Sequence, residues 1–235
     1  MNNNNKYIDW KNWSQDSFAK TTKLEEFYFD NIIKLLKLKK SSKILEIGFG
    51  NGSFLGYAIS KNYSYVGIES NEKLVNLAIS NNFSAFTSLK QINKKDKYDL
   101  IILLDVLEHI LPDKVEDFFT EINLFLEQNG SIFLRFPNGS SPLGLGNQHG
   151  DSTHCNIITI PKLDFWCFNS GLKVESYRGD KRPFIFRHNI LKMPSRIVKL
   201  FLHIVTEKYI RIISNQSKGI LSSNLEVVVK KIDEN

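Results

Sequence analysis

A chain of 235 residues with 42% apolar and 24% charged residues has the composition of one globular domain with a sizeable core. Its net charge of +6 is local, because residues 178–218 hold ten basic and two acidic side chains and leave −2 for the remainder, so we expect no nucleic-acid partner. No apolar run reaches ~18 residues, the first residues do not resemble a signal peptide, and Cys155 and Cys167 lack metal or redox spacing, so we expect a cytoplasmic protein.

Residues 1–38 predict a helical cover that precedes a main domain at 39–235. Apolar residues recur at helical spacing over about 22–38, which indicates an amphipathic helix. Upstream of it, Tyr7, Trp10 and Trp13 stand in a polar setting. Two interpretations stay open: these rings pack the helix onto a sheet, or they help to shape a ligand pocket.

The next stretch predicts a buried strand, a glycine turn and a helix. Residues 43–47 are a short apolar run typical of a parallel strand, and apolar residues return at helical spacing from Phe54. Between them lie Gly48, Gly50 and Gly52. Glycine permits a positive φ and the close approach of a ligand, and the start of a helix presents unpaired N–H groups. The sequence therefore predicts a small-molecule site at this turn.

The turn does not have the spacing of a dinucleotide site, because residue 53, where G-x-G-x-x-G needs its third glycine, is Ser53. Glu46 precedes the first glycine, and an acid there suits a ligand with an ammonium group better than a pyrophosphate. A second short strand ends at Glu69, 21 residues after Gly48. A carboxylate at that place can accept both hydroxyls of a ribose.

Together, Glu46, the three glycines and Glu69 resemble motif I of the class I S-adenosylmethionine (SAM)-dependent methyltransferases. The resemblance implies an α/β fold, a doubly wound seven-stranded Rossmann-like sheet. It also implies SAM as cofactor, S-adenosylhomocysteine as product, and cofactor contacts from these residues and Ser70. After a weak third strand at 83–86, the acid that many relatives place near the adenine is replaced by Thr87 and Ser88.

Residues 98–105 form the clearest strand, apolar without alternation, as a central parallel strand should be. The run Asp-Val-Leu-Glu-His-Ile that follows from Asp105 resembles motif IV of the methyltransferase group that includes the ubiquinone-biosynthesis O-methyltransferases. The resemblance places Asp105, Val106 and Leu107 under the methionine part of the cofactor.

Some members of that group bind a divalent cation at the positions of Asp105, Glu108 and His109. Two carboxylates and an imidazole are chemically able to hold Mg²⁺. We favour the alternative, in which Glu108 and His109 cap and orient the next helix and no metal is bound.

A helix is expected to start at Pro112, to carry apolar residues as far as Leu126, and to stop at Asn129 and Gly130. A fifth strand at 131–138 leads into a loop at 139–154. At about 16 residues this loop is longer than a connection needs. Ligands of open α/β sheets bind beyond the carboxyl ends of the strands, so the loop is a candidate acceptor site.

Methyl transfer from a sulfonium is an in-line displacement that depends on alignment of the nucleophile. An alcohol acceptor must also lose its proton, and histidine is suited to take it near neutral pH. We predict His154 as this base, oriented by Asp151, with His109 as the rival. Bacterial methyltransferases of surface-polysaccharide pathways carry a similar Asp-x-Thr-His. The alternative is that His154 only caps or packs the following element.

The end of the chain predicts a helix at 161–171 and strands at 172–177 and 224–231, the last antiparallel to the rest by resemblance. A basic insertion occupies about 178–223, with a helix over 195–213. This helix is a candidate for peripheral contact with an anionic membrane, for binding a phosphorylated acceptor, or for a homodimer face. The alternative is a solvated basic surface.

The resemblance predicts a SAM-dependent methyltransferase that O-methylates a sugar or glycan precursor in bacterial surface polysaccharide biosynthesis. A small-molecule or glycan acceptor is the expected partner. Two alternatives stay open: an O-methyltransferase of a quinone or other aromatic molecule, and a non-catalytic SAM-binding protein. Motif IV lacks an Asn/Asp-Pro-Pro-Tyr-like run, which disfavours N-methylation.

Overall fold

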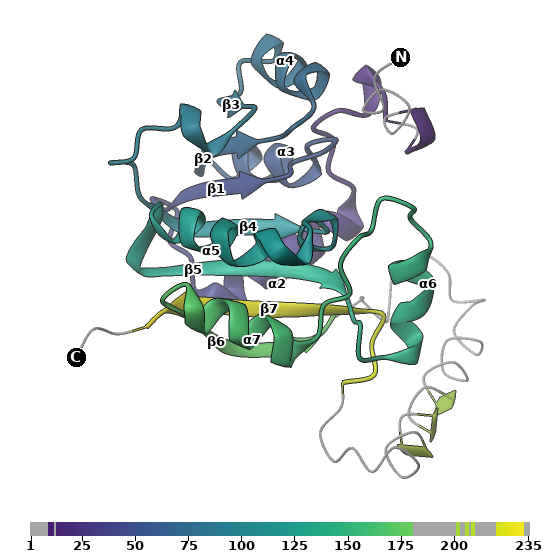
Figure 1. The fold of residues 1–235 in the computed structure, drawn as a ribbon. Coiled ribbons are helices and arrows are strands. Elements are labelled where there is room, and N and C mark those ends of the chain that lie inside the picture. Colours follow the sequence, from purple (N-terminus) through teal and green to yellow (C-terminus); the bar gives the residue numbers. More distant parts are fainter. Residues whose placement is uncertain are drawn as a thin grey trace.

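A seven-stranded sheet lies at the centre of the molecule (Figure 1). The computed structural model describes residues 9–11, 13–180, 201–202, 205–206, 208–209 and 220–232. Within them the strand order is β3-β2-β1-β4-β5-β7-β6, and β7 runs antiparallel to the other six strands. This confirms the predicted doubly wound sheet. The strands are β1 Lys43–Ile47, β2 Ser64–Ile68, β3 Ala85–Phe86, β4 Tyr98–Leu104, β5 Leu126–Pro137, β6 Leu172–Gly179 and β7 Asn224–Lys231.

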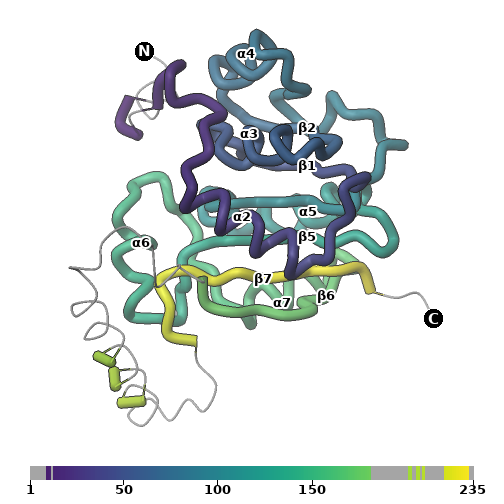
Figure 2. Tube along the Cα trace, turned by 180° about the vertical axis from the view of Figure 1, so that it is seen from behind, coloured from purple at the N-terminus to yellow at the C-terminus, as the bar shows by residue number. Residues whose placement is uncertain are grey.

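Helices cover both faces of the sheet (Figures 1 and 2). One face carries α2 (Lys23–Leu36), α3 (Ser53–Ser60) and α4 (Glu72–Ser80), and the other carries α5 (Val115–Asn123) and α7 (Ile160–Asn169). The short helix α6 (Leu145–His149) lies beyond the carboxyl ends of the parallel strands. That edge of the sheet is thus where side chains from several strands and loops can meet.

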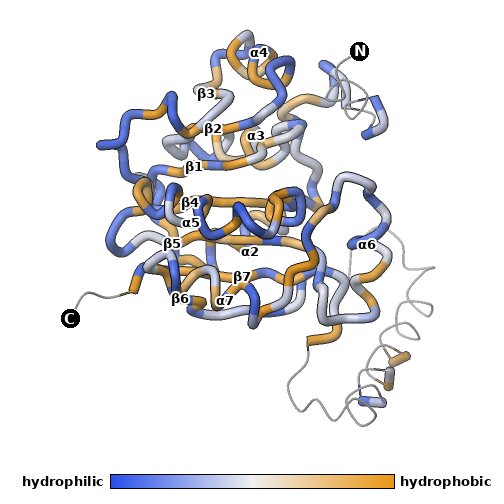
Figure 3. Tube along the Cα trace, viewed as in Figure 1, coloured by the Kyte–Doolittle hydropathy of each residue, from blue (hydrophilic) through white to orange (hydrophobic). Residues whose placement is uncertain are grey.

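The sequence builds two apolar layers by alternation along each strand. Leu45 and Ile101 point into the layer beneath α5 and α7, whereas Ile44 and Leu100 point into the layer beneath α2, α3 and α4. All four side chains are fully buried. Because both faces of the sheet are covered at its centre, β4 is apolar without interruption from Leu100 to Leu104. Figure 3 shows hydrophobic colour along β1 and β4 and hydrophilic colour in many of the loops.

Local signals set the ends of α2, the predicted helix of the N-terminal cover. The Thr22 hydroxyl and the Glu25 carboxylate form a capping box at its start, and Lys37 ends it in a left-handed conformation with φ of 51°. Phe29 and Ile32 of α2 are buried in the same layer as α3. The helix therefore shares its core with the main domain.

The helix predicted to run from Pro112 to Asn129 is wrong in its second half. A 3₁₀ turn at Pro112–Lys114 precedes α5, which ends at Asn123, and β5 already begins at Leu126. The backbone N–H of Tyr98 donates to the Phe125 carbonyl at 2.8 Å, and Phe125 is buried in the core. Phe125 and Leu126 fit the apolar spacing of a helix, but Leu126 is the first residue of β5 and Phe125 directly precedes it.

The basic insertion is mostly outside the described residues. Its predicted start at 178 is too early, because β6 extends to Gly179. Of the helix expected over 195–213, residues 201–202, 205–206 and 208–209 are described, and they are helical. No helix in the described part of the chain combines the length and the apolar character that crossing a membrane demands.

Phe119 on α5 is fully buried in the core layer, whereas Phe168 on α7 is 72% exposed. Phe119→Ala should lower the free energy of unfolding by about 3–5 kcal/mol, because it removes buried apolar surface and leaves a cavity. Phe168→Ala should change it by no more than about 0.5 kcal/mol. Urea unfolding followed by circular dichroism measures both, and equal losses would contradict the assignment of this layer as core.

Candidate functional site

A pocket of about 1140 Å³ lies at the carboxyl edge of the sheet. Its wall is built from the ends of several parallel strands, from the loop after β5, and from Trp10, Lys11 and Trp13 near the start of the chain. Most of the predicted site residues line it together: Glu46, Gly48, Gly50, Glu69, Ser70, Asp105, Val106, His109, Asp151 and His154.

Two predicted cofactor residues do not line this pocket. Gly52 is the N-cap of α3, where its φ of 74° lets the turn close onto the helix. The Leu107 side chain is 1% exposed and lies in the apolar layer beneath α5. Both residues belong to the motifs, but Gly52 starts a helix and Leu107 packs in the core.

The glycine turn packs tightly against its surroundings. Gly48 has φ of 74°, and a Cβ there would lie 2.5 Å from a methyl carbon of Val106. Gly50 has φ of 53°, and a Cβ there would lie 2.8 Å from the Trp13 ring. Glu69 holds the turn, since its carboxylate accepts the Gly50 N–H at 3.0 Å. At both positions a residue larger than glycine is thus disfavoured by the positive φ and by the close contact with Val106 or Trp13.

Glu46 is a buried acid on the floor of the pocket, 3% exposed. Burial raises the pKa of its carboxyl group to about 8, the nearby Glu69 charge adds to the rise, and the hydrogen bond from the Tyr65 hydroxyl opposes it. That hydrogen bond, from β2 to β1, is 2.5 Å long. Tyr65 was not predicted from the sequence, although it lies on β2, directly beside β1.

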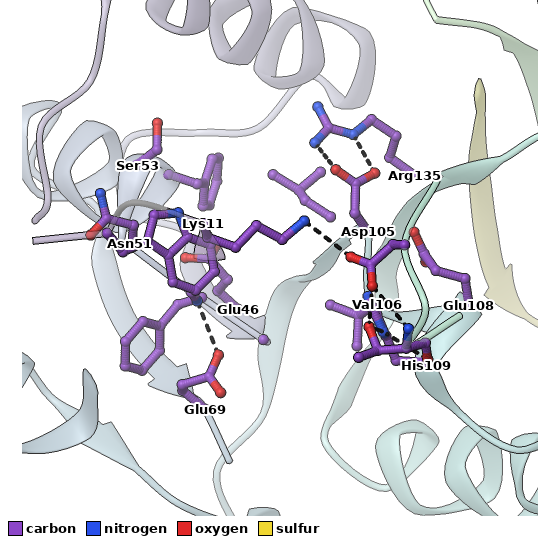
Figure 4. A pocket seen from close by; sticks show the side chains of 18 of the residues that line it. Lys11, Glu46, Asn51, Ser53, Glu69, Asp105, Val106, Glu108, His109 and Arg135 are labelled. Carbon is purple, nitrogen blue, oxygen red and sulfur yellow. Dashed lines mark hydrogen bonds and ion pairs between the residues drawn. The ribbon is translucent and has the colours of Figure 1, made fainter. Parts of the chain in front are cut away.

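Asp105 forms an ion pair that was not predicted from the sequence. Arg135 on β5 donates to both carboxylate oxygens, with 2.9 Å between its Nε and Oδ1 of Asp105. Asp105 itself has φ of 58°, a strained value for a residue with a side chain. Figure 4 shows the two side chains facing each other. The signal in the sequence was a single cation within the apolar strand β5.

His154 is oriented by a different group from the one predicted. Its Nδ1 lies 3.1 Å from the Gln148 carbonyl oxygen, and because a carbonyl only accepts, Nδ1 carries the proton. The unprotonated Nε2 lies 3.9 Å from carboxylate oxygens of both Glu108 and Asp151. Asp151 therefore stands beside the basic nitrogen rather than behind the ring.

Asp151 instead organises the neighbouring groups. Its Oδ1 accepts the Thr153 N–H at 2.9 Å and the Thr153 hydroxyl at 2.5 Å, and its Oδ2 lies 3.1 Å from Nζ of Lys11. Burial opposes its charge, but these donors outweigh burial and hold the pKa of Asp151 well below its usual value. The same Thr153 oxygen lies 3.0 Å from Nδ1 of His109.

Glu108, His109 and His154 offer one ligand atom each within 4.8 Å of one another. Glu108 is 1% exposed, its two carboxylate oxygens have no hydrogen-bond partner, and burial followed by repulsion from Asp105 raises its pKa to about 8. This set fits a divalent cation, with His154 in the place expected for Asp105. Two imidazoles suit Zn²⁺ or Mn²⁺ better than Mg²⁺.

Comparison with known proteins agrees with this geometry. A family model described as a methyltransferase domain matches residues 21–177, about two thirds of the chain. The chain belongs to this methyltransferase family. A ubiquinone biosynthesis O-methyltransferase of Pelagibacter ubique (strain HTCC1062) is 27% identical to this chain over 121 residues. That alignment spans 45% of this chain and 48% of the relative, so this chain spans about half the length of the curated relative that it matches.

Solved structures share the fold of the methyltransferase over nearly its whole length. A SAM-dependent methyltransferase from Archaeoglobus fulgidus has a TM-score of 0.64 and 18% identity, covering 98% of this chain and all of that one. One from Clostridium acetobutylicum ATCC 824 has a TM-score of 0.60 and 9% identity, covering 99% of this chain and 100% of its own. At these identities the likeness concerns the fold.

Glu46 should make the ligand-free methyltransferase less stable as the pH rises from about 5 to 8. Its pKa of about 8 in the folded state exceeds the ordinary 4.5, so unfolding within this window releases a proton. Glu46→Gln keeps the shape and the acceptor for Tyr65 but removes this dependence. As the pH rises, the free energy of unfolding of the variant, measured with urea, should increase relative to that of the wild type by up to ~1.4 kcal/mol per pH unit.

The control for this measurement is Glu127→Gln, which changes an exposed glutamate on β5. Its difference in unfolding free energy from the wild type should stay constant across the same pH range. A constant difference for Glu46→Gln as well would contradict the raised pKa of Glu46.

Proposed function

We propose that the protein transfers a methyl group from SAM to a hydroxyl oxygen of a polar, hydroxyl-rich acceptor, such as a sugar of a glycan or of its precursor. The observation that carries this proposal is the sharing of one pocket. The glycine turn with Glu69 lines it, and so do His109 and His154. A cofactor held by the first group would thus present its methyl group within the space that the histidines face.

The cofactor side of the proposal is supported by the carboxylates of the pocket. Glu69 offers oxygen atoms at the end of β2, where ribose hydroxyls are expected, and its bond to Gly50 fixes its position. Asp105 stands at the end of β4 with its carboxylate held by Arg135. A methionine ammonium and a sulfonium are cations, and acidic walls favour such a ligand over a pyrophosphate.

The acceptor side is supported by the polarity of its wall. Between Pro137 and His154 the lining residues are glycines, Asn147, Asp151, Thr153 and His154, and Pro137 is the one apolar side chain. Asn224, at the start of β7, adds an amide. Amide, hydroxyl and carboxylate groups can exchange hydrogen bonds with the hydroxyls of a sugar, which a long apolar chain cannot do.

In the proposed reaction the acceptor oxygen attacks the methyl carbon in line with the departing sulfur, and the pocket supplies alignment. His154 Nε2 is the proposed proton acceptor, because its lone pair is left free by the bond of Nδ1 to Gln148. Once protonated, this ring would face the Asp151 carboxylate and the Glu108 carboxyl group, each 3.9 Å from Nε2. Asp151, whose pKa lies well below its usual value, would stabilise the imidazolium, and this is the role that we propose for it.

A second candidate is an aromatic acceptor carrying hydroxyl groups. The relative from Pelagibacter ubique is called a ubiquinone biosynthesis O-methyltransferase, and Trp10 and Trp13 supply ring faces beside the pocket. Assays of methyl transfer to nucleotide sugars, to simple glycosides and to catechols, with labelled SAM as donor, separate the two classes of acceptor. Turnover confined to catechols would favour the aromatic class.

Glu69→Gln tests the cofactor assignment. Loss of the carboxylate charge should weaken SAM binding about 10- to 100-fold, since charge-assisted hydrogen bonds to the ribose contribute ~1.5–3 kcal/mol. Titration calorimetry of wild type and variant with SAM and with NAD measures this. Binding of NAD without binding of SAM to the wild-type chain would overturn the proposed function.

His154→Ala should lower kcat by ~10²–10⁴-fold and leave the Kd for SAM unchanged, because it removes the proposed base. The paired variant is His109→Ala, and both are assayed with and without a chelator once an acceptor is found. Turnover that stops with chelator and returns with Zn²⁺ or Mn²⁺ would assign the cluster of Glu108, His109 and His154 to a metal instead. Full turnover of His154→Ala would make the residue structural.

A further inference from the structure

One segment near the start of the chain touches both ends of the pocket. We call it the N-terminal strap, meaning the described residues of 9–21. In Figure 4, Glu46, Asn51 and Glu69 lie on one side of the pocket, and Asp105 and His109 lie on the other. Lys11 of the strap stretches between the two groups. The strap thus runs from the proposed cofactor side to the proposed acceptor side.

The cofactor end of the strap is tied to the glycine turn by hydrogen bonds. The Ala19 N–H donates to the Asn51 carbonyl at 2.9 Å, and the Asn51 side chain donates to the Ser17 carbonyl at 3.0 Å. The Thr21 hydroxyl donates to the Ser53 carbonyl at 2.7 Å. These bonds join the strap to the residues that follow Gly50.

Trp13 adds a side-chain contact at the same place. Its ring lies against Gly50, so closely that a Cβ on this glycine would come within 2.8 Å. Trp13 also lines the pocket. A ligand resting on the glycine turn would therefore meet both the turn and the strap, and the strap would be one wall of its site.

At its acceptor end the strap forms an ion pair with Asp151. Nζ of Lys11 lies 3.1 Å from Oδ2 of Asp151, whose side chain is 7% exposed. The same ammonium lies 4.5 Å from the centre of the Trp10 ring. A buried carboxylate needs a counter-charge, and here the counter-charge comes from a segment 140 positions earlier in the chain.

Asp151 connects Lys11 to the proposed catalytic groups. Its second oxygen accepts the Thr153 hydroxyl, and that hydroxyl oxygen lies beside Nδ1 of His109. Asp151 also faces His154. Movement of Lys11 away from Asp151 would change the charge and the hydrogen bonds around both histidines.

We propose that Lys11 is a positioning residue that couples the two halves of the pocket. Its pairing with Asp151 keeps the strap, with Trp13, closed over the cofactor side, and cofactor binding in turn favours the ordered acceptor loop. This inference rests on the proposed function. Coupling of this kind is reciprocal, so a change at Asp151 must alter SAM affinity even though Asp151 belongs to the acceptor loop.

The test is calorimetric binding of SAM to the wild type and to Lys11→Met, Lys11→Arg, Asp151→Asn and the Lys11→Met/Asp151→Asn double variant. We expect about three- to fivefold weaker binding for each single variant except Lys11→Arg, which should stay within about twofold of the wild type. The double variant should bind no more weakly than either single variant, because each removes the same ion pair.

Lys23→Met, at an exposed position at the start of α2, is the matched control and should bind SAM as the wild type does. The coupling would be overturned if Lys11→Met bound SAM with wild-type affinity, or if the losses of affinity of the two single variants multiplied in the double variant. In either case, SAM binding by the wild type would leave the proposed function standing. Absence of SAM binding to the wild type would overturn both. Thermal unfolding of each variant checks that the fold is retained.

Discussion

The carboxyl ends of the parallel strands all emerge at one edge of the sheet, and the function of this protein depends on that constraint. β1 lies between β2 and β4, so the chain leaves β1 toward one side of the sheet and leaves β4 toward the other. A crevice at this switch of direction is unavoidable. The glycine turn after β1, Glu69 after β2, Asp105 after β4 and the long loop after β5 border it for topological reasons. Their distances along the sequence are therefore irrelevant to their closeness.

Carboxyl groups gather at this crevice, and those of Glu46, Glu108 and Asp151 are buried. Asp105 is compensated by Arg135, and Asp151 by Lys11 and Thr153. Glu46 and Glu108 have no cationic partner among the described residues, and both have raised pKa values. Such carboxyl groups cost stability near neutral pH. Their presence in a fold with two well-packed apolar layers is understandable if they serve a ligand, since a purely structural core would place apolar side chains there.

Short-range patterns in the sequence were enough to place the central strands and the glycine turn, and the resemblance to class I methyltransferases predicted the seven-stranded sheet. Most residues predicted to contact the cofactor line one pocket, and their contacts with SAM stay a prediction. Apolar runs located the strands, and alternate glycines between two acids located the turn. The prediction failed where tertiary contacts decide. Phe125 and Leu126 continue a helical period but are drawn into the sheet beside Tyr98. Arg135, Tyr65 and Lys11 act on residues 19 to 140 positions away, and their partners could not be found without strand register. His154 was predicted, but the group that orients it was not. That group is the backbone carbonyl of Gln148, and its position depends on the conformation of the loop, not on the type of residue 148.

The place of β7 has a consequence for how the chain is made. This strand pairs with β5 on one side and β6 on the other, yet it follows both in the sequence. A ribosome therefore releases β5 and β6 before the strand that joins them exists, and the backbone groups of β5 that later pair with β7 must wait in water or with a chaperone. Leu225, Val227 and Val229 then complete the apolar layer already begun by α5 and α7. The sheet can close only after β7 has been synthesised, and a nascent chain halted before residue 224 would present an open, apolar strand edge.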